Sequence, residues 1–287
     1  MTTETVSPIR HVSDTALWVA VYRAMESERP DALFHDPYAR RLAGERGEAI
    51  VDTMPLGKQM SWAMVIRTAV MDEMIMRCIQ QGAKTVLNLA AGLDTRAYRL
   101  ALPADLHWIH VDFQPMIDYM QEHLSGETAR CHLEYVAADL REPEQRDAVF
   151  KKASEHGPVL VITEGLLVYL LPEHVTSLAK ALHNTAKATW WITDLASPLL
   201  LKRLGKSWSK KLAQGNAPFQ FAPEQGTAFF KPFGWIEVEY RSNWDESIRL
   251  NRTMRFAWFW TIMMKLQPKA QQEASRRMSG IVLLKSE

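Results

Sequence analysis

Four residues that could bind a nucleoside-like ligand stand at or just beyond the ends of apolar runs in this chain. They are Gly92, Asp112, Asp139 and Glu164. The carboxyl ends of parallel strands meet at one edge of a sheet, and in open α/β sheets ligands bind beyond that edge. If the apolar runs are parallel strands, these four residues border one site.

The glycine lies in a turn that favours one kind of nucleotide-like ligand over another. The apolar run 85–89 has the length and composition of a buried parallel strand, and it leads into Ala90, Ala91 and Gly92. A dinucleotide needs several glycines so that backbone amides can surround its pyrophosphate. A ligand without phosphate needs only a close approach to the backbone. The turn therefore favours S-adenosyl-L-methionine over NAD, with Ala90 and Gly92 in contact with it.

The two aspartates suit the nucleoside part of such a ligand. Asp112 comes 20 residues after Gly92 (112 − 92), a spacing at which a carboxylate accepts hydrogen bonds from a ribose diol. Its alternative role is a cap for a helix that opens at Pro115. Asp139 could accept a hydrogen bond from the adenine amine while Leu140 covers the ring. The alternative for Asp139 is a helix cap before Pro143.

Two further charged residues interrupt apolar surroundings. Glu164 follows five core-type residues, and a buried carboxylate needs a partner, either a cationic ligand or a protein arginine. Arg67 interrupts an apolar helix stripe, and its guanidinium needs an anion. The carboxylate of the cofactor's methionine part is one candidate, and a salt bridge to Asp72, Glu73 or an acid of the sheet is the other. Tyr169 could line the acceptor pocket or belong to the core.

The elements that would position these residues alternate between strand and helix. Helices at Asp14–Ser27 and Leu56–Gln81 precede them. Strands are predicted near 84–89, 107–112, 132–137, 158–163 and 188–194, with helices near 95–101, 114–124, 143–155 and 172–186. This order predicts a mostly parallel sheet with helices on both faces.

The last third of the chain departs from that alternation. An inserted helix is predicted at Pro198–Gln214, and two later strands at Trp235–Tyr240 and Ile281–Lys285 fit an antiparallel hairpin. An aromatic helix at 244–264 and the insertion would cover the acceptor pocket. Three arginines could meet an acidic acceptor or form a solvated face; they are Arg249, Arg252 and Arg255.

Composition narrows the class of protein. The 287 residues carry a net charge of +1 and are 47% hydrophobic, which favours a small-molecule ligand over nucleic acid or a membrane surface. Cys78 and Cys131 form no CxxC pair and are interpreted as reduced thiols of a cytoplasmic protein. The nine histidines show no metal-ligand spacing such as HExxH, so no metal is expected.

Several segments in register resemble the leucine carboxyl methyltransferase family, whose bacterial branch includes enzymes similar to the tetracenomycin polyketide carboxyl methyltransferase. The segments are Arg67–Asp72, Asn88–Arg96, Asp112, Asp139–Leu140 and Glu164–Leu170. The resemblance covers residues 14–194 well and the C-terminal third loosely. It implies a Rossmann-like class I methyltransferase fold with a seven-stranded sheet, an N-terminal helical cap and an inserted lid.

The resemblance also implies a map of the cofactor. Arg67 would hold the carboxylate of S-adenosyl-L-methionine, Gly92 its methionine arm, Asp112 the ribose, Asp139 with Leu140 the adenine, and Glu164 the amino group. The chain would be one methyltransferase domain, 1–287. Its parts would be a cap at 1–82, a cofactor-binding core at 83–196, a lid insertion at 197–234 and a C-terminal part at 235–287.

The expected reaction is methyl transfer from the sulfonium to an oxygen of a small organic acid or polyketide-like molecule. A carboxylate acceptor needs no base at pH 7, whereas a hydroxyl would need one. No catalytic residue is assigned, and Glu164 and Tyr169 are candidates for positioning. Two alternatives remain open: a protein carboxyl methyltransferase that acts on a chain terminus, and a non-catalytic protein that binds the cofactor. The oligomeric state is not predicted.

Overall fold

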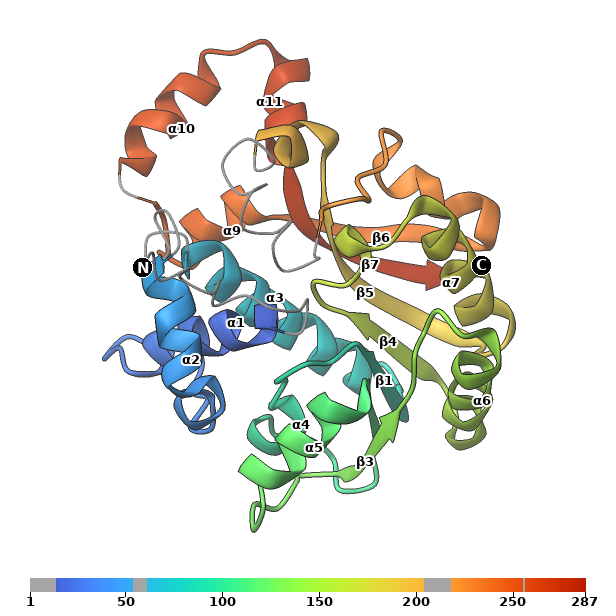
Figure 1. Cartoon of the computed structure of the whole chain (residues 1–287). Coiled ribbons are helices and arrows are strands. Elements are labelled where there is room, and N and C mark those ends of the chain that lie inside the picture. The colour runs from blue at the N-terminus through green and yellow to red at the C-terminus, as the bar shows by residue number, and fades with distance from the viewer. Residues whose placement is uncertain (1–13, 54–60, 204–217, 255) are drawn as a thin grey trace, which may run out of the picture.

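The computed structural model describes residues 14–53, 61–203, 218–254 and 256–287, and its centre is one seven-stranded sheet (Figure 1). The strand order is β3-β2-β1-β4-β5-β7-β6. Strands β1 to β5 are mutually parallel, and β7 runs antiparallel between β5 and β6. The strands are β1 (Thr85–Leu89), β2 (His107–Asp112), β3 (His132–Ala137), β4 (Val159–Thr163), β5 (Ala188–Ala196), β6 (Trp235–Ser242) and β7 (Ser279–Ser286).

Helices precede the strands and lie between them. The N-terminal helices are α1 (Asp14–Ser27), α2 (Ala39–Thr53) and α3 (Ser61–Gln80). Those between strands are α4 (Arg96–Arg99), α5 (Gln114–His123), α6 (Pro143–Ala153) and α7 (Pro172–Asn184), with the 3₁₀ turns η2 (Ser154–His156), η3 (Leu167–Tyr169) and η4 (Gly226–Phe233). The C-terminal helices lie between β6 and β7; they are α9 (Asn243–Arg249), α10 (Ala257–Lys265) and α11 (Lys269–Arg276). Within the described ranges, every helix is too short or too polar to cross a membrane.

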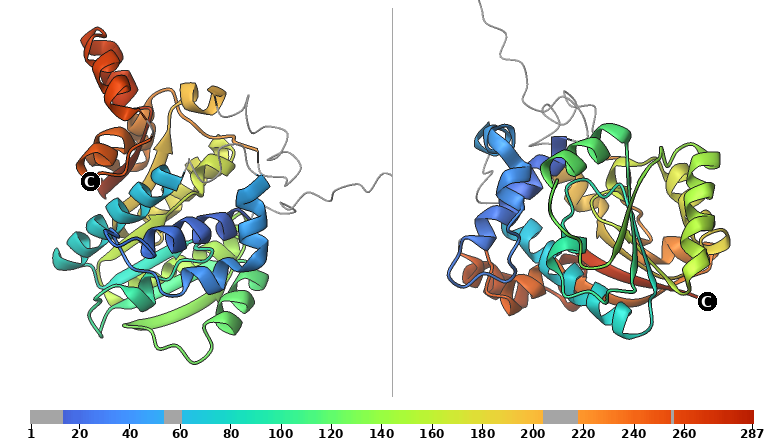
Figure 2. Two further views of the ribbon diagram at one scale, coloured as in Figure 1. Left: turned by 90° about the vertical axis from the view of Figure 1, so that its left-hand side faces the viewer. Right: turned by 90° about the horizontal axis from the view of Figure 1, so that it is seen from below.

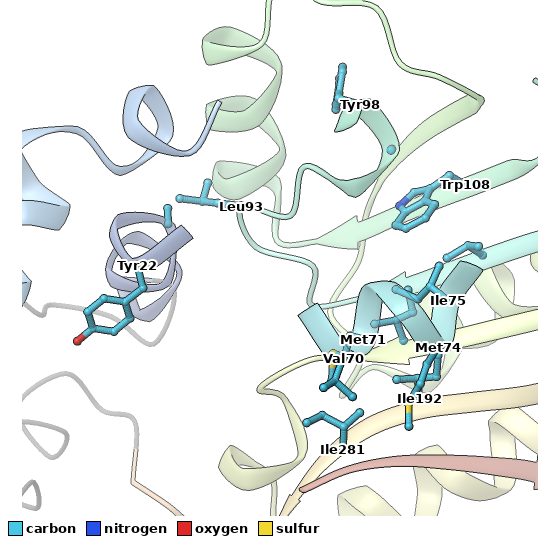
Figure 3. Close-up of a cluster of buried hydrophobic side chains, with 14 of the residues drawn as sticks. Tyr22, Val70, Met71, Met74, Ile75, Leu93, Tyr98, Trp108, Ile192 and Ile281 are labelled. Carbon is cyan, nitrogen blue, oxygen red and sulfur yellow. The ribbon is translucent and has the colours of Figure 1, made fainter. Parts of the chain in front are cut away.

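The sheet has a hydrophobic core on each face. Successive residues of a strand point to opposite faces, so Val86 belongs to one core and Leu87 to the other. The first core packs α1, α3 and α5 against the sheet, and the second packs α6, α7 and η4. Figure 3 shows α3 over the first face, where Val70 and Met74 lie near Ile192 of β5 and Ile281 of β7.

The parallel sheet, the helices on both faces and the antiparallel C-terminal hairpin confirm the predicted fold class. Among the boundaries, α1 matches its predicted range, and α3 extends from Ser61 to Gln80. The predicted start of α3 at 56 lies outside the described residues, as does the part of the predicted insertion at 204–217. Residues 198–203 of that insertion are helical.

The single aromatic helix predicted at 244–264 is wrong. The chain forms α9, breaks, and resumes as α10, because Asn251 and Phe256 adopt left-handed backbone angles, with φ of 52° and 63°. Two residues of that conformation cannot continue a right-handed helix. Figures 1 and 2 show the result: α10 and α11 extend away from the sheet.

Candidate functional site

A cavity of about 920 Å³ lies at the carboxyl ends of the parallel strands. Its walls come from α1 and α3, from the turns after β1, β2, β4 and β5, and from α9, α10 and the start of β7. Most of the predicted site residues line it; they are Arg67, Ala90, Gly92, Asp112, Glu164 and Tyr169. Asp139 and Leu140 do not belong to its described lining.

A backbone-to-carboxylate contact joins the ends of β1 and β2. The Gly92 N–H donates to Asp112 Oδ2 at 2.7 Å, and the Phe113 N–H donates to Oδ1 at 2.7 Å. Gly92 has a φ of 55°, and a Cβ there would lie 3.1 Å from the Cβ of Ala16. Ala90 is also left-handed, with a φ of 48°. The turn between them is therefore fixed by backbone geometry that favours glycine.

Asp112 keeps capacity for a ligand. Burial raises the pKa of its carboxyl, and the two N–H donors oppose that rise. A carboxylate has about four acceptor positions, so two N–H groups leave room for hydroxyl donors from the cavity. The alternative role as a helix cap is not seen, since Phe113 occupies the N-cap of α5 without a side-chain bond.

Arg67 lines the cavity and connects the ends of two strands. Its Nε donates to Glu164 Oε1 at 3.0 Å and its Nη1 to Asp194 Oδ2 at 3.2 Å. The predicted salt bridge between Arg67 and an acid of the sheet is therefore present. Asp72 and Glu73, the two partners predicted on the same helix, bind other arginines instead. Burial lowers the pKa of Arg67, but the two carboxylates outweigh it and raise the pKa above its usual value.

Glu164 also has a second guanidinium partner. Arg96 Nη1 donates to Glu164 Oε2 at 2.7 Å and to Asp94 Oδ2 at 2.7 Å, while Arg96 Nε donates to Asp72 Oδ1 at 2.6 Å. Burial raises the pKa of Glu164, but Arg96 and Arg67 outweigh it and lower that pKa. Glu164 is thus ionised. Of the two partners predicted for it, a cationic ligand and a protein arginine, the structure shows the arginine.

Three members of this network were not assigned to the site by the sequence, namely Asp94, Asp194 and Arg96, and Asp72 was named only as a possible partner of Arg67. Asp194 stands near the end of β5, as Asp112 does on β2, so the rule of acids at strand ends could have identified it. Its Oδ1 also accepts from the Gly165 N–H at 2.7 Å. Asp72 and Arg96 lie inside helices, where their spacing alone gives no signal of a shared contact.

The predicted adenine residues lie beside the cavity rather than in its wall. Asp139 pairs with Arg141, whose Nη2 donates to Oδ2 at 2.6 Å, and Leu140 packs against the second core. The Arg141 guanidinium lies 5.9 Å from the ring centroid of Phe113. Phe113 does line the cavity next to Asp112, and no pattern in the sequence marks it as a site residue.

No histidine appears in the described lining of the cavity. His110 lies behind it, with Nε2 at 3.2 Å from the Gly92 carbonyl oxygen, and burial lowers its pKa to about 4. Tyr169 lines the cavity and its ring centroid lies 5.7 Å from that of Phe219. Burial raises the pKa of Tyr169 to about 12, so the phenol is protonated at neutral pH.

The predicted arginine row does not reach the cavity in the described structure. Arg252 is buried and bonds to Glu26 and Asp31, whereas Arg249 bonds to Glu73 and Glu246. Arg255 lies outside the described residues. Both described arginines tie the C-terminal part to the N-terminal helices. In the part of the chain that the structure describes, Cys78 and Cys131 are free thiols, and no cluster of His, Cys, Asp and Glu fits a metal ion.

The fold is the Rossmann-like fold of class I methyltransferases, and the cavity lies at the carboxyl edge of the sheet, the edge beyond which open α/β sheets bind their ligands. A family model described as leucine carboxyl methyltransferase matches residues 16–183. The chain belongs to this family.

Related bacterial proteins have been provisionally named S-adenosyl-L-methionine-dependent methyltransferases. One from Streptomyces avermitilis is 31% identical over 77% of this chain and 80% of its own length. One from a Parafrankia species is 36% identical over 58% of this chain, and one from Saccharopolyspora erythraea is 34% identical over 60%. The match to these two spans 57% and 63% of their lengths.

Solved structures show the same fold at low sequence identity. A DUF574 family protein from Streptomyces avermitilis has a TM-score of 0.57 and is 14% identical, with 94% of this chain and 97% of that chain covered. A provisionally named methyltransferase from Thermobifida fusca has a TM-score of 0.58 and is 14% identical, with 98% and 96% covered.

Proposed function

We propose that this protein is an S-adenosyl-L-methionine-dependent O-methyltransferase that acts on the carboxylate of a small organic acid. The observation that most directly supports this cofactor is the Gly92–Asp112 contact at the cavity wall. It combines a glycine turn that a ligand can approach closely with a carboxylate at the spacing expected for a ribose contact. The names of the related bacterial proteins support the same cofactor.

Arg67 and Glu164 suit the amino acid end of this cofactor. Within the described residues, two of the five guanidinium N–H groups of Arg67 are bound by Glu164 and Asp194, and the side chain borders the cavity. The others could hold the cofactor carboxylate. Glu164 is ionised and could accept a hydrogen bond from the cofactor ammonium group.

Asp139 and Leu140 remain the proposed adenine contacts, and the structure adds Phe113 to them. Phe113 lines the cavity beside Asp112, so an adenine ring bound on that side would contact Phe113. The Arg141 guanidinium, 5.9 Å from the Phe113 ring centroid, would have to move for adenine to stack on that ring. Aromatic stacking would fix the ring, and Asp139 would reach its amine only if it exchanged part of its contact with Arg141.

The proposed chemistry is an in-line displacement. An acceptor carboxylate oxygen attacks the methyl carbon, a C–O bond forms, and the C–S bond breaks with its electron pair on sulfur. S-adenosyl-L-homocysteine and a methyl ester result, and no proton is transferred. Catalysis is then mainly positioning and exclusion of water, for which Glu164 and Tyr169 are the candidates.

The described cavity lining offers no evident general base for neutral pH, which supports a carboxylate acceptor over a hydroxyl acceptor. The described cavity lining holds no histidine, and the phenol of Tyr169 is protonated at pH 7. The carboxylates of the described lining already accept hydrogen bonds from protein donors; they are Asp94, Asp112, Glu164 and Asp194. A hydroxyl acceptor would need a base to take its proton.

Two measurements test the proposal. Calorimetry should show binding of S-adenosyl-L-methionine and S-adenosyl-L-homocysteine, and no binding of NAD. Isotope-labelled methyl transfer into a metabolite extract, read by mass spectrometry, should give a product that releases methanol in mild alkali, at a rate nearly constant from about pH 6 to 9.

Each other result selects a different function. An alkali-stable product whose rate rises through a basic pKa indicates a hydroxyl acceptor. Label on a protein chain terminus indicates the protein carboxyl methyltransferase. Binding of the cofactor without turnover across acceptors indicates a non-catalytic protein, and binding of NAD alone contradicts the proposed cofactor.

A further inference from the structure

The cavity continues past the proposed cofactor contacts into a region of different chemistry. We call this region the acceptor lobe and define it by side chains from three helices. They are Trp62 and Met64 of α3, Trp244 of α9, and Trp260, Met263 and Met264 of α10. The proposed cofactor contacts Gly92, Asp112 and Arg67 are polar or backbone groups, whereas the lobe presents thioethers and indole rings.

The size of the cavity leaves room for a second molecule beside the cofactor. Ligand sites range from roughly 300 to 1,000 Å³, and this cavity of about 920 Å³ lies near the upper end. Of the six methionines in the described lining, Met116 comes from α5, the helix after Asp112. The other five come from α3, from α10 and from the segments just before α10 and β7; they are Met64, Met254, Met263, Met264 and Met278. Methionine is flexible and polarisable and adapts to varied apolar shapes.

Helix α10 forms one wall of the lobe and is incompletely packed. In Figures 1 and 2 it lies outside the body of the molecule and beside α11. Trp260 is 53% exposed and Met263 44% exposed although both face the cavity. A polar cofactor would not cover these side chains, but an apolar ligand in the lobe would bury them, which is favourable in proportion to the area removed from water.

The two faces of α10 can be told apart. At about 100° per residue, Trp258 and Ile262 project opposite to Trp260 and Met264. Trp258 and Ile262 are 67% and 51% exposed and lie outside the described lining of the cavity. Trp258 and Ile262 therefore serve as control positions for substitutions in the lobe, because they are apolar residues of the same helix that face away from it.

We infer that the acceptor is an organic acid with a bulky apolar body, which fills the lobe against the inner face of α10 while its carboxylate reaches the methyl group. This inference rests on the proposed function and specifies its substrate class. A flexible alkyl chain and a rigid ring system share this chemistry, so the test includes both.

The test measures binding of straight-chain carboxylic acids of 4 to 14 carbons to the full chain saturated with S-adenosyl-L-homocysteine. Each added methylene should tighten binding about fourfold until the lobe is filled, since burial of one methylene contributes about 0.8 kcal/mol. A polycyclic aromatic acid of matched carbon number forms the second arm. Stronger binding of the chain indicates an alkyl acceptor, and stronger binding of the ring system indicates a polycyclic one.

Trp260→Ala and Met264→Ala should flatten this dependence, with at least tenfold weaker binding of the longest acid, unchanged binding of the shortest and unchanged binding of S-adenosyl-L-homocysteine. Trp258→Ala and Ile262→Ser should leave every value as in the wild type. Equal slopes for the inner-face variants and the wild type, or no dependence on chain length, would overturn the inference. If the protein does not bind S-adenosyl-L-homocysteine at all, the proposed function fails instead.

Discussion

At the scale of single residues, Arg67 is the side chain on which the proposed cofactor map depends most. It is buried, yet it borders the cavity and already binds Glu164 and Asp194. We expect Arg67→Ala to weaken binding of S-adenosyl-L-homocysteine by about 2–5 kcal/mol, the scale for loss of one partner of a buried charge pair. Calorimetry measures the change, and Arg67→Lys should retain part of the affinity because it keeps the charge.

The control for this prediction lies on the same helix. Arg77 of α3 pairs with Glu239 of β6, outside the described lining of the cavity, and Arg77→Ala should leave cofactor affinity unchanged. If Arg67→Ala lowers the free energy of unfolding but not the affinity, the arginine serves only to hold the strand ends together.

His110 gives a second residue-scale prediction, on acid stability. Its pKa falls from 6.5 in the unfolded chain to about 4 in the fold, mainly through burial. The unfolded state therefore binds more protons between these values, so stability is present above pH 6.5 and is lost as the pH falls toward 4. This group alone should remove about 2 kcal/mol from the free energy of unfolding between pH 7 and 5.

Urea unfolding at several pH values tests this. His110→Gln should flatten the slope of the unfolding free energy between pH 7 and 5, whereas His174→Gln, at an exposed position of α7, should keep the wild-type slope. An unchanged slope for His110→Gln would contradict the assignment.

What the sequence could predict at this scale depended on backbone position. Gly92, Asp112 and Glu164 stand at strand ends, and strand ends are readable from apolar runs. Arg67 was recognisable because it interrupts an apolar stripe. Which acids of the sheet it pairs with was not predictable, since Glu164 and Asp194 lie 97 and 127 residues away in the chain (164 − 67 and 194 − 67), and only the folded sheet brings them to Arg67. The side-chain partner of Asp139 likewise depends on rotamers that no spacing rule determines.

At the scale of elements, Arg252 joins the segment after α9 to the last turn of α1 and to the segment that follows α1. Its guanidinium bonds to Glu26, which is buried, and to Asp31. Removal of one partner leaves the other buried charge uncompensated, so Arg252→Ala should lower the free energy of unfolding by about 3–5 kcal/mol. Urea unfolding measures this loss.

Arg276→Ala is the matched control, because Arg276 and its partner Asp245 are about half exposed and 3.5 Å apart. Exposed pairs of this kind contribute roughly 0–1 kcal/mol. Equal effects of the two substitutions would show that Arg252 does not hold the segments together.

This contact also explains why one element was mispredicted. Helical periodicity at 244–264 is continuous in the sequence, and Arg249, Arg252 and Arg255 follow it. The chain instead turns at Asn251, which brings the Arg252 guanidinium to Glu26. A tertiary ion pair and two left-handed residues therefore override a local pattern that reads as one helix.

At the scale of the whole molecule, the cavity is built from segments that lie far apart in the chain. Ala16 of α1, Arg67 of α3, the turn at Gly92 and Gly280 of β7 all line it. A cofactor bound there would contact the predicted cap and core at once. The division of the chain at 82, 196 and 234 stays a prediction. Cooperativity of unfolding tests it, because parts that share one site should unfold together.

The last prediction follows from this shared site. S-adenosyl-L-homocysteine at 100 times its dissociation constant should raise the free energy of unfolding by about 2.7 kcal/mol, because it binds the folded chain and not the unfolded one. Urea unfolding followed by tryptophan fluorescence and by circular dichroism should give one transition, with both signals shifted equally, and NAD at the same concentration should cause no shift. If the cofactor shifts only one of two separate transitions, the cap and the core fold as independent units. If it shifts neither, no cofactor binds at the carboxyl edge of this sheet.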